Sequence, residues 1–284
     1  MSRKIAMTGA TGFVGRQILR ALIKQELNVR IIKRPSSQLP DWANRERIEC
    51  VEVSDLFSAS QPQLESLVSG CDTLIHAAWY TVPGEYLYSF RNVDCLIGTL
   101  LLAQAFQGCG GKRFIGIGTC FEYDVDVGRL KPDSPLLPKT PYAAAKVSSF
   151  QMLSQTLNTT DLSFAWCRLF YLYGEDEDPR RLVSYVRAKL GAGEPVDLGS
   201  GKQIRDFLDV QTAGNLVAEV ALSDYRGPLN ICSGQPVTVR EIVERLADEY
   251  GRRDLLRFGV RPDNTFDPPC VFGLPWEPKQ QKVK

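Results

Sequence analysis

The sequence has 284 residues, of which 44% are hydrophobic and 24% are charged. That length and composition suit one large domain, or a large domain with a smaller partner, built around a substantial core. The formal net charge of +1 at pH 7 gives no reason to expect a nucleic acid or an anionic membrane as a partner.

The sequence shows no pattern typical of a membrane anchor or a metal site. No window approaches the roughly 18 apolar residues that span a bilayer, and the N-terminal residues lead directly into a strand pattern instead of a signal peptide. We therefore expect a soluble, cytoplasmic protein. The eight cysteines form no CxxC pair and there is one histidine, so we predict neither a disulfide framework nor a bound metal.

Short apolar runs alternate with longer amphipathic segments through the first two thirds of the chain. The predicted strands are "KIAMTG", "VRIIK", "IECVEV", "DTLIHAA", "RFIGIG" and "FAWCRLF", and the predicted helices span about 13–26, 61–69, 86–106 and 142–157. Strands that are apolar throughout and separated by helices indicate βαβ units, with a parallel sheet covered on both faces. We predict an α/β fold of the Rossmann type, a doubly wound parallel sheet.

The composition changes after residue 173, where loops rich in glycine and proline connect shorter elements. This texture predicts a smaller, mixed C-terminal lobe. One later segment, "RDFLDVQTAGNLVAEVAL", has the pattern of a strand and a helix that return to the main sheet. We therefore assign 1–170 with 206–224 to the larger domain, and 171–205 with 225–284 to the smaller lobe.

A glycine-rich turn follows the first predicted strand and leads directly into a helix. Glycine there permits a tight turn, lets backbone amides approach a pyrophosphate, and allows close packing of helix on strand, while the helix N-terminus attracts negative charge. Because strand, turn and helix come in the required order, we prefer a dinucleotide site to a merely tight turn. The predicted cofactor contacts of this turn are Gly9, Thr11, Gly12, Phe13, Val14 and Gly15.

Two basic residues, Lys33 and Arg34, follow the second predicted strand. Dinucleotide folds that prefer NAD usually place a carboxylate here to hold the ribose 2′-hydroxyl. A guanidinium instead grips a 2′-phosphate with two charge-assisted hydrogen bonds. We therefore favour NADP(H) over NAD(H), with Arg34 as the main contact and Lys33 as a flanking charge. The alternative is an ordinary solvated basic loop.

Two tyrosine–lysine pairs have the spacing of one helical turn. Tyr142 with Lys146, and Tyr185 with Lys189, would each share one face of a helix. A lysine ammonium favours the phenolate of a neighbouring tyrosine, which helps the phenol to exchange a proton near neutral pH. Tyr142 follows a strand that ends in "GIGTC", where the carboxyl ends of parallel strands form a ligand crevice. We therefore prefer Tyr142 and Lys146 as catalytic residues, and expect Tyr185 on a solvated helix face.

Taken together, several motifs resemble the extended short-chain dehydrogenase/reductases, the NAD(P)-dependent epimerase/dehydratase family. They are the GxxGxxG turn, "HAA" after the fourth strand, a hydroxyl residue after the fifth, YxxxK and "GSGKQIRDFLDV", and they extend over nearly the whole chain. The resemblance implies an enzyme that modifies a nucleotide sugar, with NAD(P) in the larger domain and the substrate in the smaller lobe. It also implies a homodimer formed through the two long helices at about 86–106 and 142–157.

The resemblance assigns roles residue by residue. Thr119 would hydrogen-bond the substrate carbonyl or alcohol, Tyr142 would be the acid/base, and Lys146 would assist it and hold the nicotinamide ribose. The further cofactor contacts that the resemblance implies are Asp55, Leu56, Ala77, Ala78, Leu169 and Phe170.

The resemblance also implies where the substrate binds. Arg205 and Arg261 match two arginines that bind the nucleotide diphosphate, a group that arginine recognises well. The alternative is a pair of surface arginines without a ligand. Trp79 and Tyr80 either wall the substrate pocket or simply pack at the start of a loop.

The residues after Thr119 narrow the reaction. Sugar 4,6-dehydratases of the family place Asp and Glu there for the elimination of water, whereas this chain has Cys120 and Phe121, so we disfavour dehydration. Glu122 comes one position too late to replace those acids, because a shift by one points a side chain to the other side of a strand. Cys120, and Tyr171 where many members have asparagine, are the remaining predicted substrate contacts.

The basic residues after the second strand also favour a net reductase, which must take up NADPH, over an epimerase, which keeps NAD bound. The sequence thus predicts an NADPH-dependent reductase of a nucleotide-linked 4-keto-6-deoxysugar, similar to the deoxyhexose 4-ketoreductases of bacterial glycan pathways. The alternatives are a nucleotide-sugar 4-epimerase and a reductase of small non-nucleotide carbonyl compounds. The intact Tyr142 and Lys146 speak against a cofactor sensor, and the lack of a base other than His76 speaks against a cysteine nucleophile.

Overall fold

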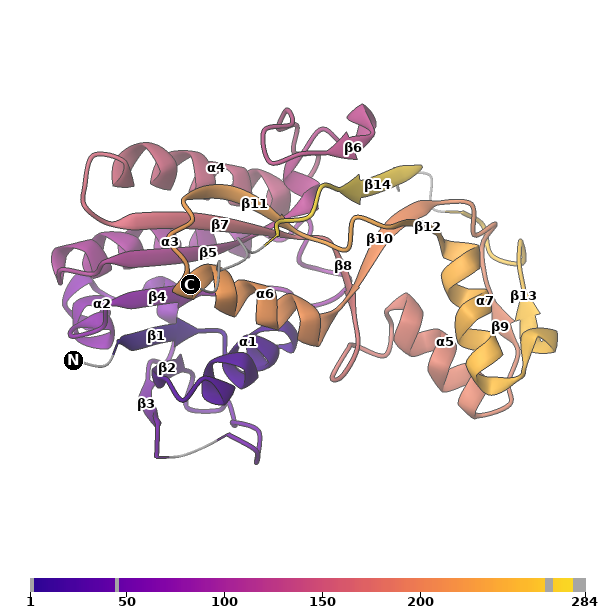
Figure 1. Ribbon diagram of the computed structural model, residues 1–284, viewed down its shortest axis with the longest axis horizontal. Helices are drawn as coiled ribbons and strands as arrows, with labels where there is room; N and C mark the ends of the chain where they lie inside the picture. The colour runs from indigo at the N-terminus through magenta and orange to yellow at the C-terminus, as the bar shows by residue number, and fades with distance from the viewer. Residues whose placement is uncertain (1–2, 44–45, 264–267, 278–284) are drawn as a thin grey trace, which may run out of the picture.

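Seven parallel strands form the main sheet of the computed structural model, which describes residues 3–43, 46–263 and 268–277. Their order across the sheet is β11-β7-β5-β4-β1-β2-β3 (Figure 1). The strands are β1 (Lys4–Thr8), β2 (Asn28–Lys33), β3 (Ile48–Glu52), β4 (Thr73–His76), β5 (Arg113–Thr119), β7 (Ser163–Leu169) and β11 (Gly227–Ile231). The chain builds outward from β1 to β3 and then crosses back to β4, so a crevice opens at the carboxyl ends between β1 and β4. The predicted fold class is confirmed.

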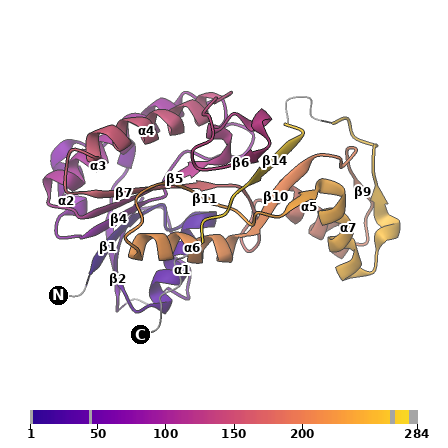
Figure 2. The ribbon, with the colours of Figure 1, turned by 45° about the horizontal axis from the view of Figure 1, so that its top comes forward.

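Helices cover both faces of this sheet, as Figures 1 and 2 show. One face carries α1 (Phe13–Lys24) and α6 (Val210–Leu222), and the other carries α2 (Gln61–Val68), α3 (Arg91–Gly108) and α4 (Pro141–Leu157). Each face has its own buried apolar cluster, because the strand residues point alternately to the two sides. Within the described part of the chain, no helix is long and apolar enough to cross a membrane.

The first of the two long helices is shorter than predicted. The sequence pattern placed its start at about residue 86, but α3 begins at Arg91, and residues 83–88 form turns. The side-chain amide of Asn92 donates to the carbonyl oxygens of Tyr86 at 2.6 Å and of Ser89 at 2.9 Å. These bonds stabilise the turn conformation and satisfy carbonyls outside the helical hydrogen-bond pattern.

A second, mixed sheet lies beyond the carboxyl ends of the main strands and is formed largely by later segments of the chain, with β6 added from the first half (Figure 2). Its order is β12 (Pro236–Thr238), β10 (Ile204–Asp209), β14 (Cys270–Gly273) and β6 (Arg129–Leu130), with β8 (Tyr171–Tyr173) pairing with β10. The far end of the lobe holds α5 (Leu182–Gly191), α7 (Val239–Tyr250), β9 (Val196–Asp197) and β13 (Leu256–Arg257) around a separate apolar cluster. The 3₁₀ turns are η1 (Leu56–Ser58), η2 (Cys120–Glu122), η3 (Val125–Val127) and η4 (Arg253–Leu255).

The strand predicted to return to the main sheet at about residue 206 does not do so. This strand is β10, and it pairs with β8, β12 and β14 in the second sheet, whereas β11 pairs with β7 and forms the edge of the main sheet. The helix that follows β10 does return, because α6 packs beside α1 in the same apolar cluster. Strand alternation does not specify which sheet a strand joins. The domain division stays a prediction, with 227–231 placed in the main sheet.

Candidate active site

The glycine-rich turn after β1 has the shape that a dinucleotide needs. Gly9 has a φ of +71°, and a Cβ there would lie 2.6 Å from the backbone of Ala77. A Cβ on Gly15 would lie 1.9 Å from the carbonyl oxygen of Gly9, which accepts a hydrogen bond from the amide of Gly12 at 3.1 Å. Gly12 directly precedes α1, whose first amides have no partner within the helix. These residues fit a bound pyrophosphate.

The loop after β4, which begins at Ala77 and Ala78, is fixed against this turn by His76. The hydroxyl of Thr8 lies 2.8 Å from Nδ1 of His76 and accepts a hydrogen bond from the amide of Ala78 at 3.2 Å. Nε2 of His76 lies 2.9 Å from the hydroxyl of Thr99. Burial lowers the pKa of His76 to about 3, so the ring is neutral and serves as a structural bridge.

The other predicted cofactor residues lie at the ends of β3 and β7. Asp55 caps η1 by accepting a hydrogen bond from the amide of Phe57 at 3.0 Å, and its side chain is exposed. Leu169 is partly exposed at the end of β7. Leu56 and Phe170 are buried in apolar clusters, so little of their side-chain surface is open to a ligand.

The two basic residues after β2 differ in their surroundings. Nζ of Lys33 lies 2.6 Å from Oε1 of Glu52, at the end of the neighbouring strand β3. Arg34 is exposed, and among the described residues its guanidinium has no hydrogen bond or ion pair. Arg34 therefore carries the charge that is available to a 2′-phosphate.

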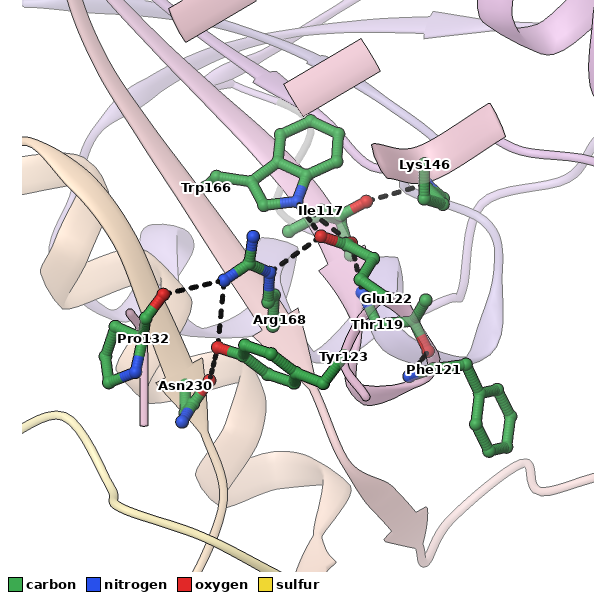
Figure 3. Close-up of polar contacts among 10 residues, drawn as sticks. All are labelled: Ile117, Thr119, Phe121, Glu122, Tyr123, Pro132, Lys146, Trp166, Arg168 and Asn230. Carbon is green, nitrogen blue, oxygen red and sulfur yellow. Dashed lines mark hydrogen bonds and ion pairs between the residues drawn. The ribbon is translucent and has the colours of Figure 1, made fainter. Parts of the chain in front are cut away.

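Thr119, Tyr142 and Lys146 come together at the carboxyl end of β5. Thr119 is the last residue of that strand, and α4 begins at Pro141 after a cap in which Thr140 accepts a hydrogen bond from the helix. The Thr119 side chain interacts with the Tyr142 hydroxyl. Figure 3 shows Thr119 close to Glu122, with Lys146 directed to Ile117 of the same strand.

Lys146 is almost completely buried, with 4% of its surface exposed. Its Nζ donates to the carbonyl oxygen of Ile117 at 2.6 Å and lies 3.6 Å from the centroid of the Trp79 ring (Figure 3 draws the first contact). Burial lowers the pKa of Lys146 to about 7, while Glu122 and Cys95 act in the opposite direction. A strongly shifted pKa in a crevice is typical of a functional group.

Tyr142 packs edge-on against two other aromatic rings. The ring centroids lie 4.9 Å from Tyr86 and 6.3 Å from Trp79. Burial of the hydroxyl raises the pKa of Tyr142 far above its ordinary value, and Tyr86 adds to this effect. The phenol is therefore protonated at neutral pH and able to donate a proton. Nζ of Lys146 is directed to Ile117 and not to the phenol, although the spacing of four does place both residues on α4.

The second tyrosine–lysine pair lies far along the chain on α5. The Tyr185 hydroxyl accepts a hydrogen bond from Arg261 at 2.9 Å, and the Arg261 guanidinium stacks on the Tyr185 ring. Tyr185 is therefore partly buried, and the expectation of a solvated face is wrong for it. Lys189 forms an ion pair with Glu194. Both side chains are occupied by structural contacts, which supports the choice of Tyr142 and Lys146.

Sequence reasoning missed a buried network directly behind Thr119. Glu122 and Arg168 form an ion pair at 2.6 Å, and Tyr123 lies beside them. The signal was present in the sequence, since an arginine inside the apolar run "FAWCRLF" needs a buried partner.

A cavity of about 440 Å³ opens between the second sheet and α5. Its lining includes three arginines, Arg181, Arg205 and Arg261, together with Tyr171. Arg205 is buried, and its guanidinium lies 5.1 Å from the centroid of the Tyr171 ring. The structure thus brings three predicted substrate residues to one cavity and adds Arg181, which sequence reasoning missed. Several guanidinium groups around one cavity suit a diphosphate.

The remaining predicted substrate residues have different surroundings. Cys120 is buried, and burial raises the pKa of its thiol to about 12, so it is neither a nucleophile nor a useful acid at neutral pH. Trp79 lies against Lys146 and Tyr142, whereas the Tyr80 hydroxyl is turned away to the Glu85 carboxylate.

Comparison with protein families matches residues 5–230 to the NAD dependent epimerase/dehydratase family. The chain belongs to this family. It is therefore an NAD(P)-dependent enzyme of the extended short-chain dehydrogenase/reductase type, in a family of nucleotide-sugar-modifying enzymes.

Similar proteins match almost the full length of the chain. dTDP-6-deoxy-L-talose 4-dehydrogenase (NAD(+)) from Aggregatibacter actinomycetemcomitans is 26% identical over 271 residues, covering 95% of this chain and 98% of the relative. GDP-6-deoxy-D-mannose reductase from Pseudomonas aeruginosa is 27% identical over 261 residues, covering 87% and 80%. A solved structure of UDP-N-acetylglucosamine 4-epimerase from Methanobrevibacter ruminantium, in complex with UDP-N-acetylmuramic acid, has a TM-score of 0.83 at 25% identity, covering 99% and 94%.

Proposed function

We propose that the protein is an NADPH-dependent reductase of a nucleotide-linked 4-keto-6-deoxysugar. The observation that carries this proposal is the set of proton-transfer groups at the end of β5. Tyr142 is a protonated phenol, while Cys120 is a protonated thiol and Glu122 is paired with Arg168. Elimination of water needs an acid and a base in addition to the tyrosine. Among the described residues next to Thr119, no free carboxylate supplies them, and reduction of a ketone needs only one proton donor.

The residues at the end of β5 have separate roles in this reaction. Tyr142 donates its proton to the ketone oxygen as negative charge develops there. The Thr119 hydroxyl hydrogen-bonds the same oxygen and stabilises that charge. Lys146 offsets the charge of the phenolate that remains. The glycine-rich turn after β1 would hold the dinucleotide, whose reduced nicotinamide would supply the hydride.

The substrate class is inferred from the cavity in the lobe. Arg205 and Arg261 lie where a diphosphate can be held, and Arg181 adds a third guanidinium. Two relatives of this chain are named for 6-deoxysugar nucleotides, one as a 4-dehydrogenase and one as a reductase. These names support a nucleotide-linked deoxysugar over a small carbonyl compound.

The cofactor preference and the assembly are further parts of the proposal. The exposed guanidinium of Arg34, which has no ion-pair partner among the described residues, supports NADPH. The exposed residues Val93, Ile97 and Leu101 form an apolar stripe along α3, at a spacing that keeps them on one face. We propose that a second copy of the chain covers this stripe in a homodimer, with α4 beside it.

A 4-epimerase is the second candidate, and one observation favours it. The ion pair between Lys33 and Glu52 removes one of the two positive charges that support a 2′-phosphate. Tightly bound NAD in the purified protein, with interconversion of C4 epimers and no net consumption of cofactor, would establish this alternative.

The experiment is to supply nucleotide-linked 4-keto-6-deoxyhexoses and to follow the oxidation of NADPH and NADH. Tyr142→Phe should lower kcat by about 10²-fold or more, because it removes the proton donor, whereas Tyr250→Phe, at an exposed position on α7, is the control and should leave kcat unchanged. Arg261→Ala should raise KM for the nucleotide-linked sugar. Full turnover by Tyr142→Phe would contradict the proposed mechanism, and an unchanged KM for Arg261→Ala would favour a small carbonyl substrate.

A further inference from the structure

A buried ion pair lies directly behind Thr119 (Figure 3). Nε of Arg168 is 2.6 Å from Oε2 of Glu122, and neither side chain is more than 1% exposed. Oε1 of Glu122 accepts a hydrogen bond from the backbone amide of Thr119 at 2.8 Å, and the carboxylate also accepts a hydrogen bond from Nε1 of Trp166. Taking two charges out of water is costly, and their mutual attraction does not always offset that cost. Such a pair calls for a role beyond stability.

Strand β5 is built to admit this carboxylate. A Cβ on Gly118 would lie 2.4 Å from Oε1 of Glu122 and 2.2 Å from Nε1 of Trp166. A Cβ on Gly116 would lie 2.2 Å from Cε3 of Trp166. The glycine spacing in "GIG" therefore leaves room for the indole and the carboxylate on one face of the strand.

Glu122 and Lys146 bind neighbouring backbone groups of this strand. The pairing of β5 with β4 ends at Gly116. The backbone amides and carbonyls of β5 that follow Gly116 and face β4 therefore need other hydrogen-bond partners. Nζ of Lys146 donates to the carbonyl oxygen of Ile117. The Glu122 carboxylate accepts a hydrogen bond from the amide of Thr119, two residues further along the strand. Lys146 has no ion-pair partner among the described residues, and Glu122 is the carboxylate whose charge acts on it.

The far side of the pair is connected to the second sheet through Tyr123 and Asn230. Nη1 of Arg168 donates to the Tyr123 hydroxyl at 2.9 Å and to the carbonyl oxygen of Pro132 at 3.0 Å. The Tyr123 hydroxyl donates to Oδ1 of Asn230 at 2.6 Å, and the Asn230 amide donates to backbone carbonyls near β6 and β14. The carboxylate of Glu122 is therefore held in one orientation by a connected network.

We propose that Glu122, oriented by Arg168, is a positioning residue for Thr119, Tyr142 and Lys146. It fixes the backbone that presents the Thr119 hydroxyl, and it supplies the negative charge that favours the ammonium form of the buried Lys146. The catalytic part of this inference rests on the proposed function, whereas the effect on Lys146 does not.

The charged groups around the trio determine the sign of the expected change. Burial lowers the pKa of Lys146, the Glu122 carboxylate favours its ammonium, and the neighbouring His76 is neutral. Burial raises the pKa of Tyr142 and the Glu122 carboxylate adds to this effect, whereas Arg168 is not among the groups that act on either side chain. Removing the charge of Glu122 therefore lowers both pKa values. The reduction needs a protonated phenol and an ammonium, so its rate falls at high pH. Both changes move this alkaline limb of the pH–rate profile to lower pH.

The test compares Glu122→Gln with Tyr123→Phe. The first removes the charge and keeps the size of the side chain, and the second removes the outer end of the same network but leaves the Glu122 carboxylate. Lysine labelled with carbon-13 at Cε reports the pKa of Lys146 by NMR, with its signal identified by its loss in Lys146→Met. We expect the pKa of Lys146 to fall by about one unit in Glu122→Gln, and to stay unchanged in Tyr123→Phe. Equal pKa values in Glu122→Gln and the wild type would overturn the proposal.

A second variant covers the case in which Glu122→Gln does not fold because Arg168 is left unpaired. Glu122→Gln combined with Arg168→Met removes both buried charges, a change that proteins often tolerate, and should lower the pKa of Lys146 in the same way. With the ketosugar as substrate, the alkaline limb in the pH dependence of kcat should move to lower pH by about as much as the pKa of Lys146 falls. In addition, kcat at neutral pH should fall about tenfold. A purely structural role predicts a lower melting temperature with an unmoved limb. The NMR measurement needs no substrate, so failure of the proposed function would leave it valid.

Discussion

The ammonium of Lys33 is neutralised by Glu52, which lies 2.6 Å away at the end of the adjacent strand. These two residues are directly paired between β2 and β3, so the fold brings their charges together whether or not a cofactor is bound. A pair of partly exposed charges contributes little stability, but it changes the electrostatics of the ribose end of the crevice. Arg34, one residue further, is left as the available cation.

Arg34→Ala should therefore weaken the binding of NADPH by about 10- to 100-fold, because charge-assisted hydrogen bonds contribute about 1.5–3 kcal/mol. Binding of NADH should stay nearly the same. Lys33→Ala is the matched control and should have a much smaller effect, since Glu52 already occupies its charge. Fluorescence titration with both cofactors measures the four constants. An equal loss of affinity for NADPH and NADH would show that Arg34 does not bind the 2′-phosphate.

Two glycines of the first turn should respond differently to alanine. A Cβ on Gly15 would lie 1.9 Å from the carbonyl oxygen of Gly9, so Gly15→Ala should lower the melting temperature and abolish dinucleotide binding together. A Cβ on Gly12 would meet only that oxygen, at 3.5 Å, so Gly12→Ala should keep the fold but weaken dinucleotide binding by blocking the approach of the phosphates. Thermal unfolding and cofactor titration on both variants separate the two effects. Wild-type affinity in Gly12→Ala would argue against a pyrophosphate at this turn.

The sequence predicted the main sheet well because its strands are apolar on both faces and its helices are amphipathic. The prediction failed where long-range pairing decides which sheet a strand joins. Nothing local distinguishes β10, which joins the second sheet, from a strand of the main sheet. At the site, two tyrosine–lysine pairs share one spacing, and the place of Tyr142 after the strand ending in "GIGTC" is what favoured the first pair. Glu122 and Arg168 lie 46 residues apart and meet only through the pairing of β5 with β7. Long-range pairs of this kind leave only the indirect signal of a charged residue within an apolar run.

The apolar stripe of α3 predicts that the protein self-associates. Val93 and Ile97 are each about half exposed, and Leu101 continues the stripe one turn further. Ile97→Asp should shift the protein to monomers in analytical ultracentrifugation, because a charge in the centre of an apolar interface is left without a partner. Val260→Asp is the control, since Val260 is as exposed but lies in the C-terminal lobe. Dimers that persist in Ile97→Asp would place the interface elsewhere.

The only histidine of the chain should make stability depend on pH in a defined window. The Thr99 hydroxyl donates to the carbonyl oxygen of Cys95 at 2.7 Å, so it accepts the Nε2 proton of His76, and Nδ1 of His76 is left to accept from Thr8. A second proton on the ring would replace that acceptor. Burial, with a smaller effect of Lys146, accordingly lowers the pKa of His76 from 6.5 to about 3.

Between pH 3 and 6.5 the unfolded chain therefore binds a proton at His76 that the folded chain does not. Stability rises with pH across this window, and it is lost as the pH falls, by up to about 1.4 kcal/mol per pH unit. His76→Asn should be less stable than the wild type at pH 7, where its bridging hydrogen bonds are missing, but the difference should shrink by about 2–3 kcal/mol at pH 4.5. Carboxylates titrate in both proteins, so the difference isolates His76. Urea unfolding at a series of pH values measures it, and a difference that stays constant with pH would show that His76 is not held neutral in the fold.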